Sequence, residues 1–157
     1  MAKSQNKKSS VAGKVILALL VILIFALFMP FSNLFLKRAR PYKVEGSEEF
    51  KRVSAILHQK CADCHTPELT AYPVYSSFPL ANQIIKHDIQ EAQEHMIFSR
   101  EMLSGQKKPT AMELARIKAA FLDGDMPPKI YLALHWDARV TPEDREALLN
   151  WIEQLKN

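Results

Sequence analysis

The sequence predicts an all-α domain preceded by a single transmembrane helix. Three observations predict this fold class: an uncharged apolar run near the amino terminus, apolar residues that recur at helical spacing further on, and helix-capping residues beside those stretches. We expect a basic tail at 1–14, a transmembrane anchor at 15–36, a linker at 37–46 and a helical domain at 47–157.

Composition and charge restrict the class of protein. The 157 residues are 48% hydrophobic and 24% charged, which suits one domain with an appendage and is too apolar for a disordered chain. The net charge of +4 arises from seven Lys and Arg residues that flank the apolar run, because residues 41–157 hold 14 basic and 17 acidic residues. A mildly acidic domain binds phosphates poorly, so we expect no nucleic-acid partner.

The apolar run, Val15 to Leu36, has 22 residues without a charge. A helix of this length spans ~30 Å, the thickness of the hydrocarbon core of a bilayer. A cleaved secretory signal is the alternative, but Leu27 to Asn33 offers bulky residues where a peptidase requires small ones, which favours a retained anchor. Pro30 is expected to kink the helix or to end it early. Basic residues are nearly balanced on the two sides, so charge alone does not set the orientation.

The first helix of the domain is predicted at 47–60. Ser47 suits an N-cap, and Glu48 and Glu49 favour the first turn of a helix through its dipole. Residues 66–79 lack periodicity and hold three prolines, which predicts an ordered loop carrying the aromatic residues Tyr72, Tyr75 and Phe78.

Three further helices are predicted, at 80–98, 110–122 and 141–155. Capping boxes or N-caps at Thr110 and Thr141 open the last two, and Gly124 suits the position after a helix end. The expected apolar contacts are Ile84, Ile85, Ile89 and Ala92, then Met112, Ala115, Ile117 and Phe121, then Leu148, Leu149, Trp151, Ile152 and Leu155. No segment has convincing strand periodicity.

Both cysteines of the chain lie in one pentapeptide, Cys61-Ala62-Asp63-Cys64-His65. This is the attachment sequence of c-type haem, in which two thiols add to the two vinyl groups of the porphyrin. The following histidine, His65, is then placed beneath the iron as the proximal ligand. We expect one covalent haem c, bound through Cys61, Cys64 and His65. In bacteria such haem is attached outside the cytoplasmic membrane, which predicts a cytoplasmic amino terminus and a periplasmic domain.

Two other interpretations of the pentapeptide are weaker. A thioredoxin-like dithiol needs a neighbouring strand, which the sequence does not offer. A zinc site could combine the two cysteines with two of the histidines His58, His87, His95 and His135, but their spacings do not complete a usual zinc motif.

The sixth iron ligand is expected to be Met126. It lies in Gly124-Asp125-Met126-Pro127-Pro128, where the prolines restrict the chain around a weak Fe–S bond. His135 and His87 are the alternatives. We expect Met96, Met102 and Met112 to fill gaps in the core, which is the more common role of methionine.

The order of these motifs resembles class I cytochrome c, which implies that the first and last helices cross, with Phe50 and Leu57 against Trp151 and Leu155. The chain is also similar to the small bacterial haem-binding domain family. The matching pieces are Cys-Ala-Asp-Cys-His-Thr at 61–66, the proline loop at 70–76, Glu-His-Met-Ile-Phe-Ser at 94–99, Gly-Asp-Met-Pro-Pro at 124–128 and Leu-His at 134–135.

These observations predict a membrane-anchored monohaem cytochrome c that transfers single electrons at the periplasmic side of the inner membrane. Its expected partners are the lipid bilayer and a membrane redox complex or other cytochromes, and an enzymatic role is the less favoured reading. The alternative is a haem enzyme or gas sensor with an open sixth site, acting on peroxide or binding nitric oxide or carbon monoxide.

Overall fold

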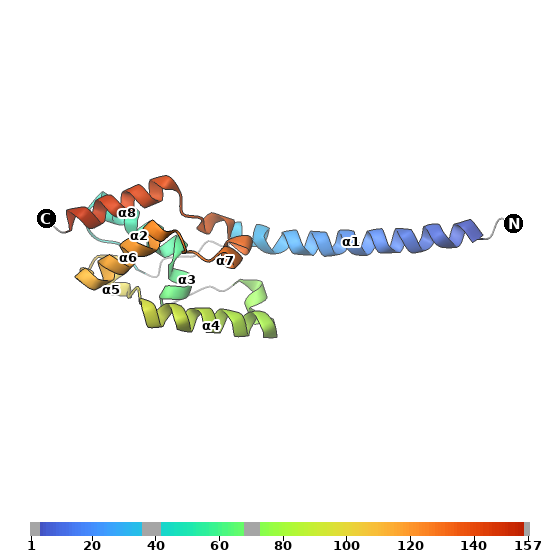
Figure 1. Cartoon of the computed structure of the whole chain (residues 1–157), viewed down its shortest axis with the longest axis horizontal. Coiled ribbons are helices and arrows are strands. Elements are labelled where there is room, and N and C mark those ends of the chain that lie inside the picture. Colours follow the sequence, from blue (N-terminus) through green and yellow to red (C-terminus); the bar gives the residue numbers. More distant parts are fainter. Residues whose placement is uncertain (1–3, 36–41, 68–72, 156–157) are drawn as a thin grey trace.

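Helices form every regular element in the part of the chain described by the structure, a computed structural model that covers residues 4–35, 42–67 and 73–155. The all-α prediction is confirmed, and Figure 1 shows a long helix extending from a group of shorter ones. Tyr72 and the first half of the expected linker, residues 37–41, lie outside the described residues. The elements are α1 (Ser4–Phe35), α2 (Glu48–Lys60), α3 (Ala62–His65), η1 (Val74–Ser77), α4 (Pro79–His95), α5 (Arg100–Ser104), α6 (Ala111–Asp123), α7 (Lys129–Leu134), η2 (Trp136–Ala138) and α8 (Pro142–Gln154).

Helix α1 is long and apolar enough to cross a membrane. Its candidate span, Val11–Asn33, has 23 residues and a mean hydropathy of 2.9. Of the two effects expected of Pro30, an early end of the helix is wrong, because α1 continues through Pro30 to Phe35. The turn after Pro30 is held from outside the helix: Asn33 is buried, and its side-chain amide donates to the carbonyl of Leu134 at 2.7 Å.

Side-chain caps fix where four helices of the domain begin, among them α5, where the Ser99 hydroxyl accepts from the backbone N–H of Met102. The hydroxyl of Ser47 accepts from the backbone N–H of Phe50, as predicted for α2. Thr110 opens α6 and Thr141 opens α8, each through a reciprocal capping box with the residue three positions on. These contacts satisfy N–H groups that the helices cannot satisfy internally.

The core lies between α2 and α8, with α5 and α6 packed around it. The ring of Phe50 lies 5.7 Å from that of Trp151, and Leu57 belongs to the same buried cluster. The crossing of first and last helices implied by the resemblance is therefore present. Leu155 is exposed at the end of α8, so that part of the expected contact is wrong.

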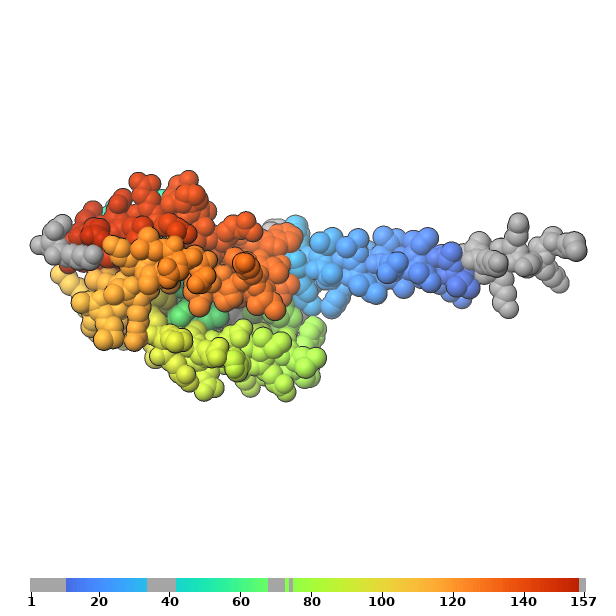
Figure 2. All heavy atoms as spheres, in the orientation of Figure 1, coloured from blue at the N-terminus to red at the C-terminus, as the bar shows by residue number. Residues whose placement is uncertain are grey.

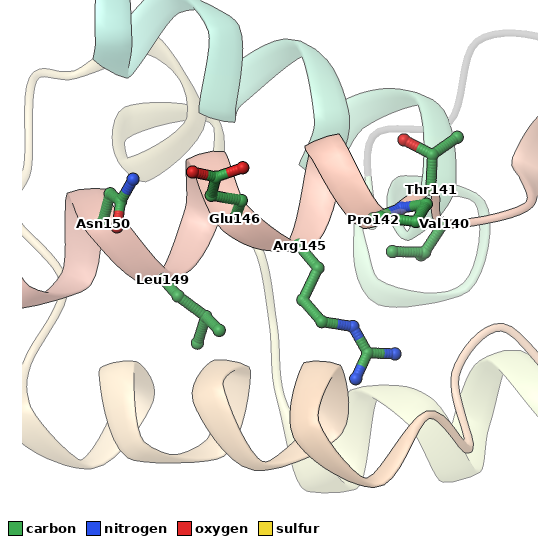
Figure 3. Close-up of a pocket in the computed structure, with 7 residues that line it drawn as sticks. All are labelled: Val140, Thr141, Pro142, Arg145, Glu146, Leu149 and Asn150. Carbon is green, nitrogen blue, oxygen red and sulfur yellow. The ribbon is translucent and has the colours of Figure 1, made fainter.

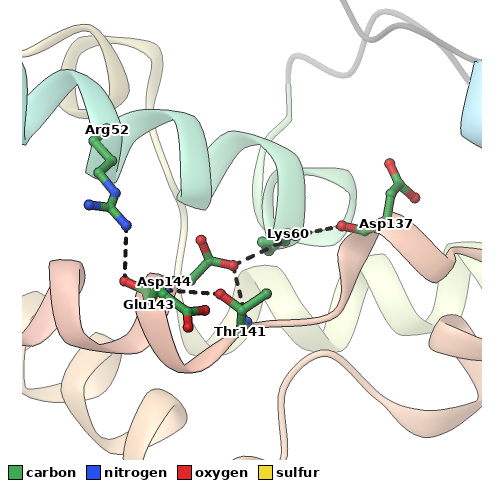
Figure 4. A network of polar contacts seen from close by, with 6 residues as sticks. All are labelled: Arg52, Lys60, Asp137, Thr141, Glu143 and Asp144. Atoms are coloured by element: carbon green, nitrogen blue, oxygen red, sulfur yellow. Dashed lines mark hydrogen bonds and ion pairs between the residues drawn. The ribbon is translucent and has the colours of Figure 1, made fainter.

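Polar contacts join α2 to η2 and to the first turn of α8 (Figure 4). The Lys60 ammonium donates to the carbonyl of Asp137 at 2.5 Å and lies 3.7 Å from the Asp144 carboxylate. Arg52 donates to the carbonyl of Glu143. Since Lys60 immediately precedes Cys61, these contacts fix the position of the Cys-x-x-Cys-His segment relative to the core.

The structure corrects several helix predictions. Helix α4 ends at His95 rather than near residue 98, because the chain from Met96 is extended and its backbone bonds to His65. Met96 therefore lies outside a helix, although it is buried.

Helices α5 and α7 were not predicted, since five and six residues are too short for a periodicity to show. On α6, Met112 and Ala115 are exposed, and Leu114, Ile117 and Phe121 form its buried face.

Gly105 is expected to tolerate no side chain. Its φ is +87°, and a Cβ there would lie 2.5 Å from the carbonyl oxygen of Glu45. We expect Gly105→Ala to lower the free energy of unfolding by about 2 kcal/mol, because the left-handed conformation alone costs roughly 1–2 kcal/mol and the clash adds to it. Urea denaturation of the full chain in detergent, followed by circular dichroism, measures this. Gly13→Ala is the control, since nothing lies within 4 Å of a Cβ at that position; an equal loss in both variants would contradict the explanation.

Candidate haem-binding site

The Cys-x-x-Cys-His segment forms a helical turn at the end of α2. Cys61 ends α2, with its N–H bonded to the carbonyl of Leu57 at 3.0 Å, and the N–H of His65 bonds to the carbonyl of Cys61 at 3.1 Å. Both cysteines are free thiols and partly buried. The turn thus brings Cys61, Cys64 and His65 within one turn of helix.

The ring of His65 is held in one orientation. Its Nδ1 donates to the carbonyl of Met96 at 2.9 Å, and the His65 carbonyl accepts from the N–H of Phe98 at 2.7 Å. The Phe98 ring lies 5.4 Å from the imidazole. Because a carbonyl can only accept, Nδ1 carries a proton, and in the neutral imidazole this leaves the lone pair on Nε2. This is the tautomer that a proximal histidine needs, and such a second bond usually accompanies a metal-ligating histidine.

The zinc alternative needs further ligands beside the two cysteines. Burial raises the pKa of the Cys61 thiol to about 12, and the neighbouring Cys64 acts in the same direction, so this thiol is neutral while no metal is bound. Within the ranges that the structure describes, no three His, Cys, Asp or Glu residues gather closely enough to hold a metal ion. The described residues therefore place no third ligand for zinc beside the two cysteines.

A hollow lies beside the segment, between α4 and the α6–α7 part of the chain (Figure 2). Helix α4 packs on α3 and η1 yet buries none of its 17 residues fully. Asn82 bonds to the carbonyl of Ser76 and Gln93 to that of Thr66, which marks the face that α4 turns toward α3. Ile85 and Ile89 lie on that face at helical spacing and are only half-buried. An apolar, incompletely covered face beside His65 fits a flat hydrophobic group such as haem.

Met126 lies in the loop that follows α6. Gly124 ends the helix with a φ of +71°, as predicted, and the Met126 side chain is exposed. The described contacts give this thioether no partner that fixes it. Its role as the sixth ligand therefore stays a prediction.

His135 is buried and lies in a polar network that the sequence reading missed. Its ring stacks on that of Tyr131, with centroids 3.9 Å apart, and its Nε2 lies 3.0 Å from the hydroxyl of Tyr75. The Tyr131 hydroxyl donates to the Asp63 carboxylate, inside the Cys-x-x-Cys-His segment. The four-residue spacing of Tyr131 and His135 is the sequence feature from which the contact between their rings could have been predicted. Ligation by His135 would require it to exchange these contacts for iron.

The other histidines lie apart from this network. The imidazole of His87 is exposed beside the carboxylates of Asp88 and Glu91, each 3.7 Å from its Nδ1. His95 is exposed at the end of α4. His58 is half-buried and bonds to the hydroxyl of Tyr42 at 3.0 Å.

We expect Tyr131→Phe to destabilise the domain. The variant keeps the ring that stacks on His135 and removes the hydroxyl bonded to Asp63, and bonds to charged groups contribute about 1.5–3 kcal/mol. Urea denaturation of the full chain in detergent measures the change. Tyr42→Phe is the matched control, since its hydroxyl bonds to the imidazole of His58 and its loss should cost about 1 kcal/mol. Unchanged stability of Tyr131→Phe would contradict the role of the network.

A surface pocket of about 450 Å³ lies elsewhere, along α8 (Figure 3). It is lined by residues 140–142 and by Arg145, Glu146, Leu149 and Asn150. In Figure 3, Arg145 and Leu149 extend from α8 toward α6. None of the predicted haem ligands lines this pocket, so we place the candidate site at the Cys-x-x-Cys-His segment.

Comparison with known proteins identifies the family of this chain. A relative named cytochrome c peroxidase Ccp, from Escherichia coli (strain K12), is 32% identical over 125 residues, which cover 76% of this chain and 27% of the relative. The chain therefore spans about a quarter of that protein. No solved structure matches the chain. The sequence model of the haem-binding domain family matches residues 21–154, which include the segment, the methionine loop and the last 15 residues of α1. The chain belongs to the haem-binding domain family.

Proposed function

We propose that this haem protein is a membrane-anchored cytochrome c that transfers single electrons on the periplasmic side of the cytoplasmic membrane. One haem is attached covalently through Cys61 and Cys64, with His65 and Met126 as axial ligands. The chain divides into a cytoplasmic tail at 1–14, an anchor at 15–36, a linker at 37–46 and a haem c domain at 47–157.

The observation that carries this proposal is the orientation of His65 within Cys-x-x-Cys-His. Its Nδ1 donates to Met96, so Nε2 is available to iron beside two free thiols. The bound haem supplies an Fe(II)/Fe(III) couple that accepts or releases one electron. Membership of the haem-binding family supports the binding of haem, and the candidate span in α1 supports the membrane anchor.

The residues around the segment hold it in place. The Lys60 contacts fix the end of α2, and the bond from Tyr131 to Asp63 ties the segment to α7. A rigid ligand set favours electron transfer, because little of the surrounding structure then has to rearrange when the charge on iron changes. Apolar residues of α4, such as Ile85 and Ile89, would keep water from one side of the group.

Peroxide reduction is the second candidate function. The name of the relative, cytochrome c peroxidase, favours it, although this chain spans only a quarter of that protein. His135 and Tyr75 would then supply acid–base groups close to the haem. A domain of this kind could also supply electrons to a peroxidase site on another domain or chain.

Carbon monoxide binding separates these two functions. The full chain is produced with haem-attachment machinery, placed in lipid nanodiscs and reduced, and its absorption spectrum is recorded after carbon monoxide is added. An unchanged spectrum, with no peroxide turnover in the presence of an electron donor, is the result we expect of a carrier with both axial positions filled. Rapid conversion to a carbon monoxide complex, together with peroxide turnover, would replace the carrier proposal by the enzyme.

A further inference from the structure

An exposed apolar rim lies at one end of the haem-binding domain. It consists of Phe78, Leu80, Ile130 and Trp136, which are 45%, 76%, 70% and 48% exposed. Phe78 precedes α4, Leu80 is in its first turn, Ile130 is in α7 and Trp136 is in η2. Single exposed apolar residues are common on protein surfaces, whereas a group of large ones at one end marks an interaction site.

The rim lies at the end of the domain where α1 leaves it. Both α7 and η2 contact α1, so Ile130 and Trp136 belong to elements packed beside the end of the candidate span. Figure 1 shows the start of α4, with the short η1 turn before it, at this same end of the domain. The apolar surface continues onto α1, where Phe31 is exposed.

The last turn of the span is fixed to the domain. Pro30 and Asn33 are buried, and the Asn33 amide donates to the carbonyl of Leu134 at 2.7 Å. The candidate span itself ends at Asn33. The domain is thus packed on the end of the span, and the rim stays close to the level where α1 would leave the hydrocarbon core.

We propose that this rim inserts into the interfacial region of the bilayer that α1 crosses, so that the domain is held on the membrane in one orientation. The inference rests on the membrane anchoring in the proposed function. The occupant is lipid because the nearest large apolar surface is the span itself. The indole of Trp136 suits this region, since it combines an exposed ring with an N–H bonded to the carbonyl of Ala133.

Charge near the rim also fits a lipid surface. Lys129 and Arg139 are exposed on either side of the α7–η2 segment, and the acidic residue between them, Asp137, is half-buried. Exposed cations beside an interfacial tryptophan suit the phosphates of lipid head groups. Helices α5 and α6 lie at the opposite end of the domain from α1 in Figure 1, where a soluble partner would find them accessible.

Spin labels on introduced cysteines test this inference in the complete haem-loaded chain. Leu80→Cys and Ile130→Cys report on the rim, Met112→Cys on an equally exposed apolar position of α6, and Ile22→Cys on the middle of the span. Each variant is reconstituted in vesicles of phosphatidylcholine and phosphatidylglycerol. The accessibility of each label to oxygen and to a water-soluble nickel chelate is measured, and the unmodified chain taken through the same labelling gives the background from any Cys61 or Cys64 thiol that carries no haem.

We expect the ratio of oxygen to nickel accessibility to be raised at the two rim labels relative to Met112→Cys. Rim labels that match Met112→Cys, while Ile22→Cys reports lipid, would overturn the inference and leave the anchor intact. An Ile22→Cys label that reports water would overturn the anchor and the inference with it. Low accessibility to both reagents, with dipolar broadening that unlabelled protein removes, would show a second copy on the rim and overturn the lipid proposal.

Discussion

Replacing both cysteines is expected to leave the protein without covalently attached haem. In Cys61→Ala/Cys64→Ala neither thiol remains to add to a vinyl group, and the chain has no other cysteine that could substitute. The variant should be colourless, or should release its haem into acidified organic solvent. The unmodified chain should keep its haem on the polypeptide under the same extraction, and a haem stain of a denaturing gel measures the difference.

The two single-cysteine variants test each thioether bond separately. Cys61→Ala and Cys64→Ala should each keep at most one thioether, which shifts the absorption bands of the reduced haem because a vinyl group remains conjugated with the ring. Met112→Ala serves as the control, since Met112 is exposed on α6 and its loss should leave attachment unchanged. Haem that is extracted equally well from the unmodified chain and the double variant would contradict covalent attachment. The structural account of His65 would then apply to a non-covalent haem.

The sequence predicted those parts of the fold that depend on local signals. Ser47, Thr110 and Thr141 cap helices because their hydroxyls bond to amides three residues away, a contact that spacing alone reveals. The Cys-x-x-Cys-His segment could also be recognised from the sequence, since its chemistry depends on five consecutive residues. The short helices α5 and α7 could not be predicted, because one or two turns carry too few residues for a periodicity.

Contacts between residues far apart in the sequence could not be predicted. The bond from His65 to the carbonyl of Met96 joins positions 31 residues apart and ends α4 earlier than its apolar pattern suggests. The bond from Tyr131 to Asp63 joins positions 68 apart, and that from Asn33 to Leu134 joins positions 101 apart. Backbone carbonyls have no signature in a sequence, so neither the orientation of His65 nor the packing of α1 on the domain was predictable.

Met126→Leu is expected to lower the reduction potential of the haem. Leucine keeps the volume of methionine and has no sulfur, so a haem ligated by His65 and Met126 would lose the soft ligand that favours Fe(II). Axial ligands set haem potentials over about 0.8 V, and we expect the loss of methionine to lower the potential by ~0.1 V or more. Redox titration of the full chain measures the potential, and the ferric spectrum should lose the absorption band that arises from sulfur-to-iron charge transfer.

Two matched variants decide between the candidate ligands. His135→Phe removes the alternative ligand and keeps an aromatic ring that can stack on Tyr131, whereas Met112→Leu changes an exposed methionine far from the segment. If Met126 is the ligand, His135→Phe keeps the charge-transfer band and Met126→Leu loses it, because the sulfur is the only source of that transition. The reverse pattern, an unchanged spectrum in Met126→Leu with altered ligation in His135→Phe, would assign the sixth position to His135. Its buried bond to Tyr75 would then have to break when haem binds, so the Tyr75–His135 pair would be an arrangement of the haem-free chain alone.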